Sequence, residues 1–423
     1  MKLFQHMLVA TASVGLIAPI AAHASDTFNF EGINDYSRSK KSSSKKYFDN
    51  KSFVNEVNED LAKLKDTEPR LEATQNNFEA GSFSNTTTMD GKVIFTIGAL
   101  NDEDKDAFTE ATMATYMVQS NLNTSFTGDD NLYIRLKSGN ATDWLKAYSY
   151  GTYLSSSKGN SDDLKVDKIW YTFPVGDHTF WVGPKIENYY MHGTTPSLYK
   201  PVTKQFTLGG NGAAYGASTS PGAGFQYNAD NGFAFSTNFT SKAGNTASGM
   251  LTDEAQTSFA TQVGYTKPNY SVSAIVNMKY NGWSDSSYFT SDEGMARPGD
   301  GNSTNIGLRA WWRPDNTGTA TPSISVGYDT SETDAVGNDN TNAYFVGLNW
   351  QDIISPDDRI GIAYGQPQKH EDDNIDPKLV EVYYEYKVND SITLTPTIFG
   401  SYHETGGTAV ETFGTVLNTT FKF

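Results

Sequence analysis

The chain has 423 residues, of which 37% are hydrophobic and 13% aromatic, and its formal net charge at pH 7 is −17. The acidic charge argues against a nucleic-acid partner, because contact with phosphate groups requires basic patches. The sequence contains no cysteine, which excludes disulfides, thiolate metal sites and cysteine nucleophiles. A polar, aromatic and glycine-rich composition favours many short strands joined by hydrated loops.

Residues 1–24 predict a secretory signal peptide. Lys2 is followed by an apolar run, and the small residues of Ala22-His23-Ala24 predict cleavage before Ser25. A membrane anchor is the alternative, although no charged stop-transfer flank follows the run. No later apolar run approaches the length of a spanning helix, so a chain that enters a membrane would have to do so as a β-barrel.

Two segments precede the strand-rich region. Residues 25–51 are rich in Lys and Ser, and we interpret them as a flexible periplasmic segment, with contact to a polyanion or the cell wall as the alternative. Residues 52–80 predict a short coiled-coil-like helix and a linker, because apolar residues from Val54 to Leu71 recur at 3-4-3 spacing. The repeat is too short for an independent coiled coil, so it could support a trimer only alongside other contacts.

Residues 81–423 repeat a strand–turn–strand pattern. In the segment VEVYYEYK, Val380 and Val382 share one face while Glu381 and Glu385 share the other. Strands of this length with aromatic ends are typical of outer-membrane barrels, whereas soluble sandwiches have shorter strands. We therefore predict an all-β fold, a transmembrane antiparallel β-barrel of about 16 strands. The strands are expected near residues 91–99, 111–126, 131–138, 166–173, 179–188, 222–228, 232–240, 258–266, 270–281, 304–313, 322–329, 342–350, 358–365, 378–388, 391–403 and 409–423.

The connections alternate between brief turns, such as PVGDH and NDS, and long polar loops, such as 139–165 and 366–377. Outer-membrane barrels have short periplasmic turns at one end and long extracellular loops at the other. The chain ends in VLNTTFKF, an alternating strand that we expect to pair with the strand near 91–99 and close the sheet. Phe421 and Phe423 are the predicted signal for the barrel-assembly machinery.

If the apolar face of each strand meets lipid, the opposite face lines the lumen, and this face is net basic. Charged rings bias which ions pass a pore, so the hypothesis is that the lumen favours anions or neutral polar solutes. The alternative is that mixed charges simply keep the channel hydrated. The residues predicted to line the lumen are Arg135, Lys137, Lys168, Trp170, Trp181, Lys185, Arg309, Trp311, Arg313, Arg359, Glu381 and Glu385.

The longest loop, residues 189–221, is rich in Pro, Gly and aromatic residues, which suits a folded loop. We predict that it enters the lumen and narrows it, with Tyr199, Lys200, Lys204 and Phe206 as constriction residues. A loop on the surface or at a subunit contact is the alternative.

No motif predicts catalysis, a cofactor or a metal site. The histidines at 178, 192, 370 and 403 lack metal-ligand spacing, and the chain has no GxSxG, P-loop or Rossmann fingerprint. A barrel lipase or protease is conceivable, because triads assemble in space. No local feature supports one, and we predict that the protein is not an enzyme.

The segments SFTGDDNLYIRLKSGN (125–140) and FPVGDHTFWVGP (173–184) resemble the opening of the barrel in cyanobacterial outer-membrane porins of the carbohydrate-selective family, often called iron-uptake porins. The resemblance covers about residues 71–423. It implies a homotrimer among outer-membrane lipid and lipopolysaccharide that admits small hydrophilic solutes. The family's basic position in the GPK segment corresponds to Lys185. Members usually carry an N-terminal surface-layer-homology domain, for which residues 25–52 are too few.

The leading function is therefore a general outer-membrane porin for passive diffusion of small hydrophilic solutes and inorganic ions. The second is a solute-selective channel for carbohydrate or for iron and other inorganic ions, in which Trp170, Trp181 and Trp311 join the 189–221 loop in a selective site. The third is a structural or adhesive surface barrel that does not conduct.

Overall fold

The structure is a computed structural model, in which the chain divides into two units, Met1–Asn76 and Asn77–Phe423. The residues described are 86–102, 111–142, 153–210, 213–215, 219–242, 244–283, 301–334, 340–371, 373–405 and 408–423. The predicted signal peptide, Lys/Ser-rich segment and helical segment all lie outside the described residues.

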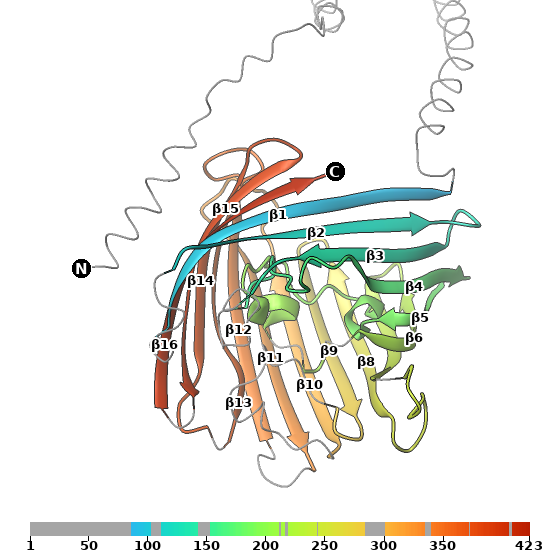
Figure 1. The fold of residues 1–423 in the computed structure, drawn as a ribbon. Helices are drawn as coiled ribbons and strands as arrows, with labels where there is room; N and C mark the ends of the chain where they lie inside the picture. The colour runs from blue at the N-terminus through green and yellow to red at the C-terminus, as the bar shows by residue number, and fades with distance from the viewer. Residues whose placement is uncertain are drawn as a thin grey trace, which may run out of the picture. The chain divides into compact units, whose positions relative to one another are not determined.

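Sixteen antiparallel strands form one closed barrel, so the predicted fold class is confirmed. Every strand pairs with its neighbours in sequence, and β1 also pairs with β16, as the blue and red strands show (Figure 1). No helix within the described ranges is long and apolar enough to cross a membrane. The strands are β1 (Thr87–Asp102), β2 (Met113–Thr124), β3 (Asn131–Gly139), β4 (Lys165–Val175), β5 (His178–Ile186), β6 (Ser220–Asn228), β7 (Phe233–Lys242), β8 (Gln256–Lys267), β9 (Tyr270–Lys279), β10 (Ser303–Trp312), β11 (Ser323–Thr333), β12 (Asn340–Gln351), β13 (Arg359–His370), β14 (Lys378–Lys387), β15 (Ile392–Thr405) and β16 (Thr408–Lys422).

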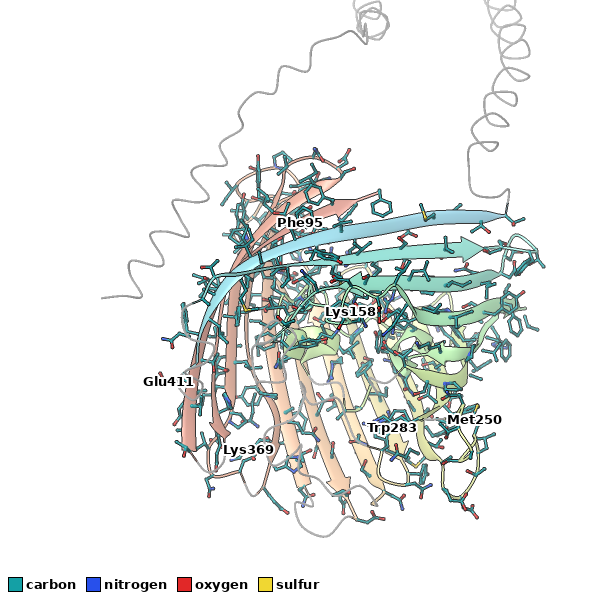
Figure 2. All side chains as sticks on the ribbon, in the orientation of Figure 1. Phe95, Lys158, Met250, Trp283, Lys369 and Glu411 are labelled. Atoms are coloured by element: carbon teal, nitrogen blue, oxygen red, sulfur yellow. The ribbon has the colours of Figure 1, made fainter. Side chains whose placement is uncertain are left out.

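The two faces of the barrel alternate as a strand period requires. In β10, Ile306 and Leu308 are 39% and 50% exposed, whereas Asn305 and Arg309, on either side of this pair, are 1% and 3% exposed. The apolar side chains therefore form the outer face, and the polar ones point inward. Phe95 marks the same outer face on β1 (Figure 2).

Strand β13 extends five residues past its predicted end, through the segment QPQKH. The sequence there is polar and contains a proline, which favours a loop. The strand continues because inward amides bond to β12: Gln366 Nε2 donates to Asn342 Oδ1 at 2.6 Å, and Gln368 Nε2 donates to Thr341 Oγ1 at 2.8 Å. Pro367 falls beside an irregularity in the β12–β13 register, where a missing N–H is tolerated.

Turn aspartates hold the short connections. Asp130 Oδ1, after the β2 end, accepts hydrogen bonds from the backbone N–H groups of Phe126 and Thr127, both at 2.8 Å, and its Oδ2 accepts from Tyr171 Oη at 2.6 Å. Asp358 serves the β12–β13 turn similarly, with Tyr384 as its tyrosine partner. These turns lie at the end of the barrel where β1 begins and β16 ends.

The barrel closes through the last residue of the chain. Phe421 pairs with Val93, and Phe423 exchanges backbone hydrogen bonds with Gly91, of 2.8 and 3.2 Å. Gly91 is required by this approach, because a Cβ there would lie 2.6 Å from the Phe423 ring. Closure matters in lipid because an open edge would leave backbone groups without partners.

Deleting Phe423 is expected to lower the yield of closed barrel, because it removes both hydrogen bonds to Gly91 at the seam. The measurement is the fraction of membrane-inserted protein that shows heat-modifiable mobility in a denaturing gel. Phe423→Trp keeps the backbone pair and a terminal aromatic, and should assemble normally. Equal yields from the deletion and the wild type would contradict the prediction.

Candidate functional site

The described residues of the connection between β5 and β6, 187–210, 213–215 and 219, lie within the ring of strands. They include two short 3-10 helices, η2 (Asn188–Met191) and η3 (Lys204–Gly209). Helix η2 contacts β6 and β7, and η3 contacts β11, β12 and β13. The green helices are drawn between the walls of the barrel (Figure 1). We call residues 187–219 the inner loop.

Buried amides hold the first part of the inner loop to the wall. Asn188 is fully buried; its Nδ2 donates to Asn238 Oδ1 and its Oδ1 accepts from Thr240 Oγ1, both at 2.8 Å. Further along, the backbone N–H of Thr194 donates to Gln262 Oε1 at 3.0 Å. Polar wall residues therefore hold this part of the loop through the Asn188 side chain and satisfy the buried N–H of Thr194.

One carboxylate holds the far side of the inner loop. Glu381 of β14 is fully buried and accepts four hydrogen bonds from the loop. Its Oε1 accepts from Tyr199 Oη at 2.8 Å and from the Val202 N–H at 3.1 Å. Its Oε2 accepts from the Thr203 N–H at 2.7 Å and from Thr203 Oγ1 at 2.6 Å. Because this one side chain accepts four hydrogen bonds from residues 199–203, Glu381 is the main polar anchor of this part of the loop.

An aromatic cluster surrounds that anchor. The Tyr199 ring lies 5.6 Å from Phe345 and 5.8 Å from Tyr383, and the Phe206 ring lies 5.5 Å from Phe345. All four side chains are buried. Loop and wall thus share an apolar core inside the barrel. This packing holds the loop against the wall in one folded position.

Two further predicted lumen residues also hold the inner loop. Arg309 donates from Nε to the Leu208 carbonyl at 2.8 Å, while its Nη2 donates to Asp329 Oδ1 at 3.0 Å. Trp311 donates from Nε1 to the Thr195 carbonyl at 3.1 Å. Both side chains are almost fully buried under the loop, so they act on the channel by positioning the loop.

Gly210 sits where the loop meets β12. Its φ is +109°, and a Cβ there would lie 2.2 Å from the Phe345 Cβ. Gly210→Ala should therefore displace this turn, because overpacking and a positive φ together cost about 1–3 kcal/mol. Limited trypsin digestion at Lys204 should become faster. Gly249→Ala is the matched control, because its φ is also positive (+67°) but its nearest neighbour would be 3.7 Å away; equal digestion of the two variants would contradict this prediction.

A second segment enters the barrel beside the inner loop. Leu154 forms a β-bridge with Thr203, the Ser155 N–H donates to the Val202 carbonyl, and the Lys204 N–H donates to the Tyr153 carbonyl, the last two at 2.7 Å. The sequence did not predict this entry. It brings Lys158 into the interior, where Figure 2 labels it.

Basic side chains gather between these two segments and strands β1, β3 and β4. Arg135 and Lys158 both form ion pairs with Asp167, the second at 3.5 Å, and Lys168 pairs with Glu187 at 2.5 Å. Lys204 lies within electrostatic range of Arg135 and Lys158. We define the basic cluster as Lys92, Arg135, Lys137, Lys158, Lys168 and Lys204, which Asp167 and Glu187 neutralise only in part.

The basic cluster affects the ionisation of Lys204. Burial lowers the pKa of Lys204; Glu187 opposes this effect, and the positive charges of Arg135 and Lys158 add to it. Burial also lowers the pKa of His192, to about 3, so that this histidine is neutral at neutral pH. The positive potential of the interior therefore comes from lysine and arginine side chains.

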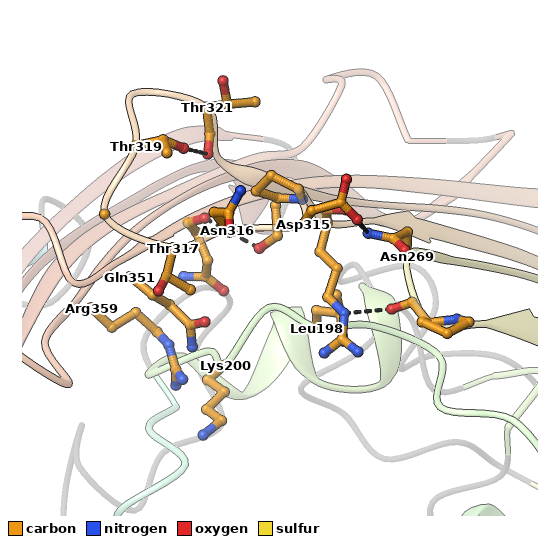
Figure 3. A pocket seen from close by; sticks show the side chains of 16 residues that line it. Leu198, Lys200, Asn269, Asp315, Asn316, Thr317, Thr319, Thr321, Gln351 and Arg359 are labelled. Carbon is orange, nitrogen blue, oxygen red and sulfur yellow. Dashed lines mark hydrogen bonds between the residues drawn. The ribbon is translucent and has the colours of Figure 1, made fainter. Parts of the chain in front are cut away.

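The remaining predicted lumen residues form an aromatic group and a group at the turn end of the barrel, with Lys185 separate from both. Trp170 packs against Tyr133 and Tyr190 in tilted arrangements, at ring distances of 4.3 and 4.8 Å, and Trp181 packs against the same group. Four others, Lys200, Arg313, Arg359 and Glu385, lie toward the turn end of the barrel; the first three line a cavity there (Figure 3), and Glu385 pairs with Arg359.

Lys185 lies apart from all of these. The register pairs it with Ile169, a neighbour of the inward Lys168, and its Nζ donates to the Val166 carbonyl at 2.6 Å. This placement does not agree with the predicted lumen position. The cause is a register shift between Gly183 and Ile186, which breaks the alternation counted along β5.

Lys92, Lys158 and Glu187 are absent from the predicted residues although they belong to the site. The signal for Lys92 was present, because Phe95 and Ile97 face outward and alternation then points Lys92 inward. Lys158 and Glu187 lie in connections, where no period assigns a face.

Comparison with known families matches residues 47–401 to the model described as Carbohydrate-selective porin, OprB family. The uncharacterized protein alr4550 of Nostoc sp. (strain PCC 7120) is 27% identical over 396 residues, which cover 81% of this chain. The chain spans 66% of the length of that relative.

Solved porins have the same fold. Pseudomonas putida OprB at high pH matches with a TM-score of 0.56 and 11% identity, over 80% of this chain and 94% of that chain. The anion-selective porin from Comamonas acidovorans matches with a TM-score of 0.55 and 12% identity, over 80% and 99%. The trimer form of OmpT from Vibrio cholerae matches with a TM-score of 0.50 and 16% identity, over 80% and 99%.

Proposed function

The chain belongs to the carbohydrate-selective porin family, OprB, and from this premise we propose that it forms a water-filled channel for small hydrophilic solutes and inorganic ions in the outer membrane. Family and fold indicate a channel rather than an enzyme, and we propose that it has no catalytic activity and needs no cofactor. Transport is then passive diffusion through the space that the inner loop leaves open.

The observation that carries this proposal is the inner loop fixed against the inside of the barrel wall, facing the basic cluster. The section between the inner loop and strands β1, β3 and β4 carries six basic and two acidic side chains, an excess of positive charge that favours anions in a pore. We propose that this section is the constriction, that Lys204 and Arg135 face the permeating solute, and that anions and neutral polar solutes pass more easily than cations.

A carbohydrate-selective channel is the second candidate, and the family description favours it. The predicted aromatic site needs revision, because Trp170 and Trp311 are each only 7% exposed and already pack or bond with neighbours. Sugar recognition in this barrel would therefore depend more on hydroxyl and charged side chains than on stacking on these indoles.

Assembly and location follow from the same premise. We propose export through a cleaved signal peptide, insertion by the barrel-assembly machinery, and a homotrimer surrounded by outer-membrane lipid and lipopolysaccharide. The apolar outer face of the strands supports the lipid contact, and the trimer form of the OmpT neighbour supports the oligomer.

Reconstitution into planar bilayers tests the function. We expect steady single-channel conductance, a reversal potential under a salt gradient that reports anion preference, and partial block by sugar if the channel is carbohydrate-selective. The absence of steady conductance from correctly folded protein would favour a structural or adhesive barrel and overturn the proposal. A strong cation preference would overturn the role given to the basic cluster.

A further inference from the structure

A cavity of about 440 Å³ lies between the inner loop and the turns of β10–β13. Leu198 and Lys200 contribute from the loop, and residues 313–319 contribute from the β10–β11 turn. The cavity is thus at the turn end of the barrel, away from the basic cluster. Its size suits a molecule larger than a simple ion.

Three cationic side chains line the cavity: Lys200, Arg313 and Arg359 (Figure 3). The Arg359 side chain extends toward Lys200 in that view. The nearby carboxylates are Asp315, which accepts from Asn269 Nδ2 at 2.7 Å, and Glu385, which lies 3.7 Å from Arg359 Nη1. Three cations and one carboxylate, that of Asp315, therefore line the cavity, which leaves the lining net positive.

The cations retain hydrogen-bonding capacity. Arg359 Nη1 is buried without a hydrogen-bond partner among the described residues, since 3.7 Å to Glu385 is an ion pair but too long for a hydrogen bond. Arg313 donates from Nε to the Pro268 carbonyl at 2.6 Å and lies 5.9 Å from the Trp311 ring; its two Nη groups make no hydrogen bond to the described residues. Within the described ranges, Lys200 makes neither an ion pair nor a side-chain hydrogen bond. An unsatisfied buried donor such as Arg359 Nη1 is costly and rare, so it points to a bound acceptor.

The cavity also offers an unsatisfied acceptor. Asn349 donates from Nδ2 to Tyr383 Oη at 2.9 Å, but its buried Oδ1 has no hydrogen-bond partner in the described part of the chain. Ser323 and Gln351 add further hydroxyl and amide groups to the lining. A ligand that matches this wall carries acceptors for the three cations and a hydroxyl that donates to Asn349.

We propose that this cavity is a binding site for a small polyhydroxylated oxyanion, of the chemical class of sugar phosphates. The planar guanidinium groups suit phosphate oxygens, and Asn349 Oδ1 and Gln351 suit sugar hydroxyls. The inference rests on the proposed channel function. The site lies between the inner loop and the turn end of the barrel, where it would bind such a solute as it passes through the channel.

Binding is measured first, by calorimetry on the intact barrel in detergent, with glucose 6-phosphate, inorganic phosphate and glucose as probes. Glucose 6-phosphate should bind more tightly than phosphate, and glucose weakest. Arg359→Gln and, separately, Arg313→Gln should each weaken glucose 6-phosphate binding roughly tenfold, the effect of one charge-assisted hydrogen bond. Lys267→Gln is the control. Lys267 lies at the same end of the barrel, but it shares the outer face of β8 with Val263 and Tyr265.

Wild-type protein that does not bind glucose 6-phosphate, or Arg313→Gln and Arg359→Gln barrels that bind it as the wild type does, would overturn the site. Equal binding of phosphate and glucose 6-phosphate would overturn the sugar part of the assignment. Because Arg313 is exposed, its variant keeps the test valid if Arg359→Gln does not fold. Conductance of the same preparations decides the channel function separately, since calorimetry does not depend on ion flow.

Discussion

Glu381→Ala is expected to raise the single-channel conductance and make it fluctuate, because it releases the inner loop from the wall. The carboxylate receives all four of its hydrogen bonds from residues 199–203 of the loop. Alanine would leave the backbone N–H groups of Val202 and Thr203 buried without acceptors. Each orphaned donor costs about 1–3 kcal/mol, or about 2–6 kcal/mol for the two.

That cost is comparable to the whole stability of a folded loop, so the loop should populate positions away from β14. Hydrogen exchange of peptides covering residues 195–210 should increase at least tenfold, while exchange in the strands stays slow. Glu381→Gln should show a smaller effect in the same direction. Its amide oxygen keeps one acceptor, but its NH2 group would face the N–H of Thr203, which is also a donor.

Glu411→Ala is the matched control for the Glu381 series. Glu411 is exposed near the loop end of β16, so its removal changes the same charge without touching the inner loop. If Glu381→Ala conducts and exchanges like this control, the aromatic contacts of Tyr199 and Phe206 are sufficient to hold the loop, and the carboxylate is not its anchor.

The barrel itself was predictable because its signal is periodic. Each strand alternates between lipid and interior, and the terminal aromatic segment had to pair somewhere if the edge was to disappear. The departures occur where the period is broken. Pro367 made the end of β13 resemble a loop, and a register shift in β5 displaced Lys185 from its counted face.

The functions of inward residues were less predictable than their direction. Alternation places Arg309, Trp311 and Glu381 inside, but it does not indicate whether an inward side chain contacts water or a loop that covers the wall. All three bind the inner loop through contacts across more than 100 residues of sequence. Strand alternation also says nothing about Lys158, which lies in a connection. Only the tertiary contacts of residues 153–158 bring it into the interior.

Reversing two charges of the basic cluster should abolish most of the anion preference. Lys137→Glu together with Lys204→Glu changes the lining from six basic and two acidic side chains to four of each. A unit charge about 8 Å from a monovalent ion contributes about 0.5 kcal/mol in water, so each reversal shifts the ion's energy by about 1 kcal/mol. Without screening by salt, about 1 kcal/mol changes the local ion concentration about fivefold for each reversal.

The measurement is the reversal potential across a tenfold salt gradient, taken at low ionic strength because screening over about 10 Å at 0.1 M weakens the effect. Lys267→Glu provides the control, since it reverses a charge on the outer face at the turn end. Heat-modifiable gel mobility should show that each variant is a closed barrel.

The comparison between variants locates the selective section. If the double variant loses anion preference while Lys200→Glu retains it, selectivity arises where the inner loop faces β1, β3 and β4. If Lys200→Glu has the larger effect, the narrow section lies toward the turn end, near Arg359 and Lys422, whose charges lower the pKa of Lys200 after burial. If neither changes the reversal potential, the mixed charges only keep the channel hydrated, and anion selectivity is not a property of this barrel.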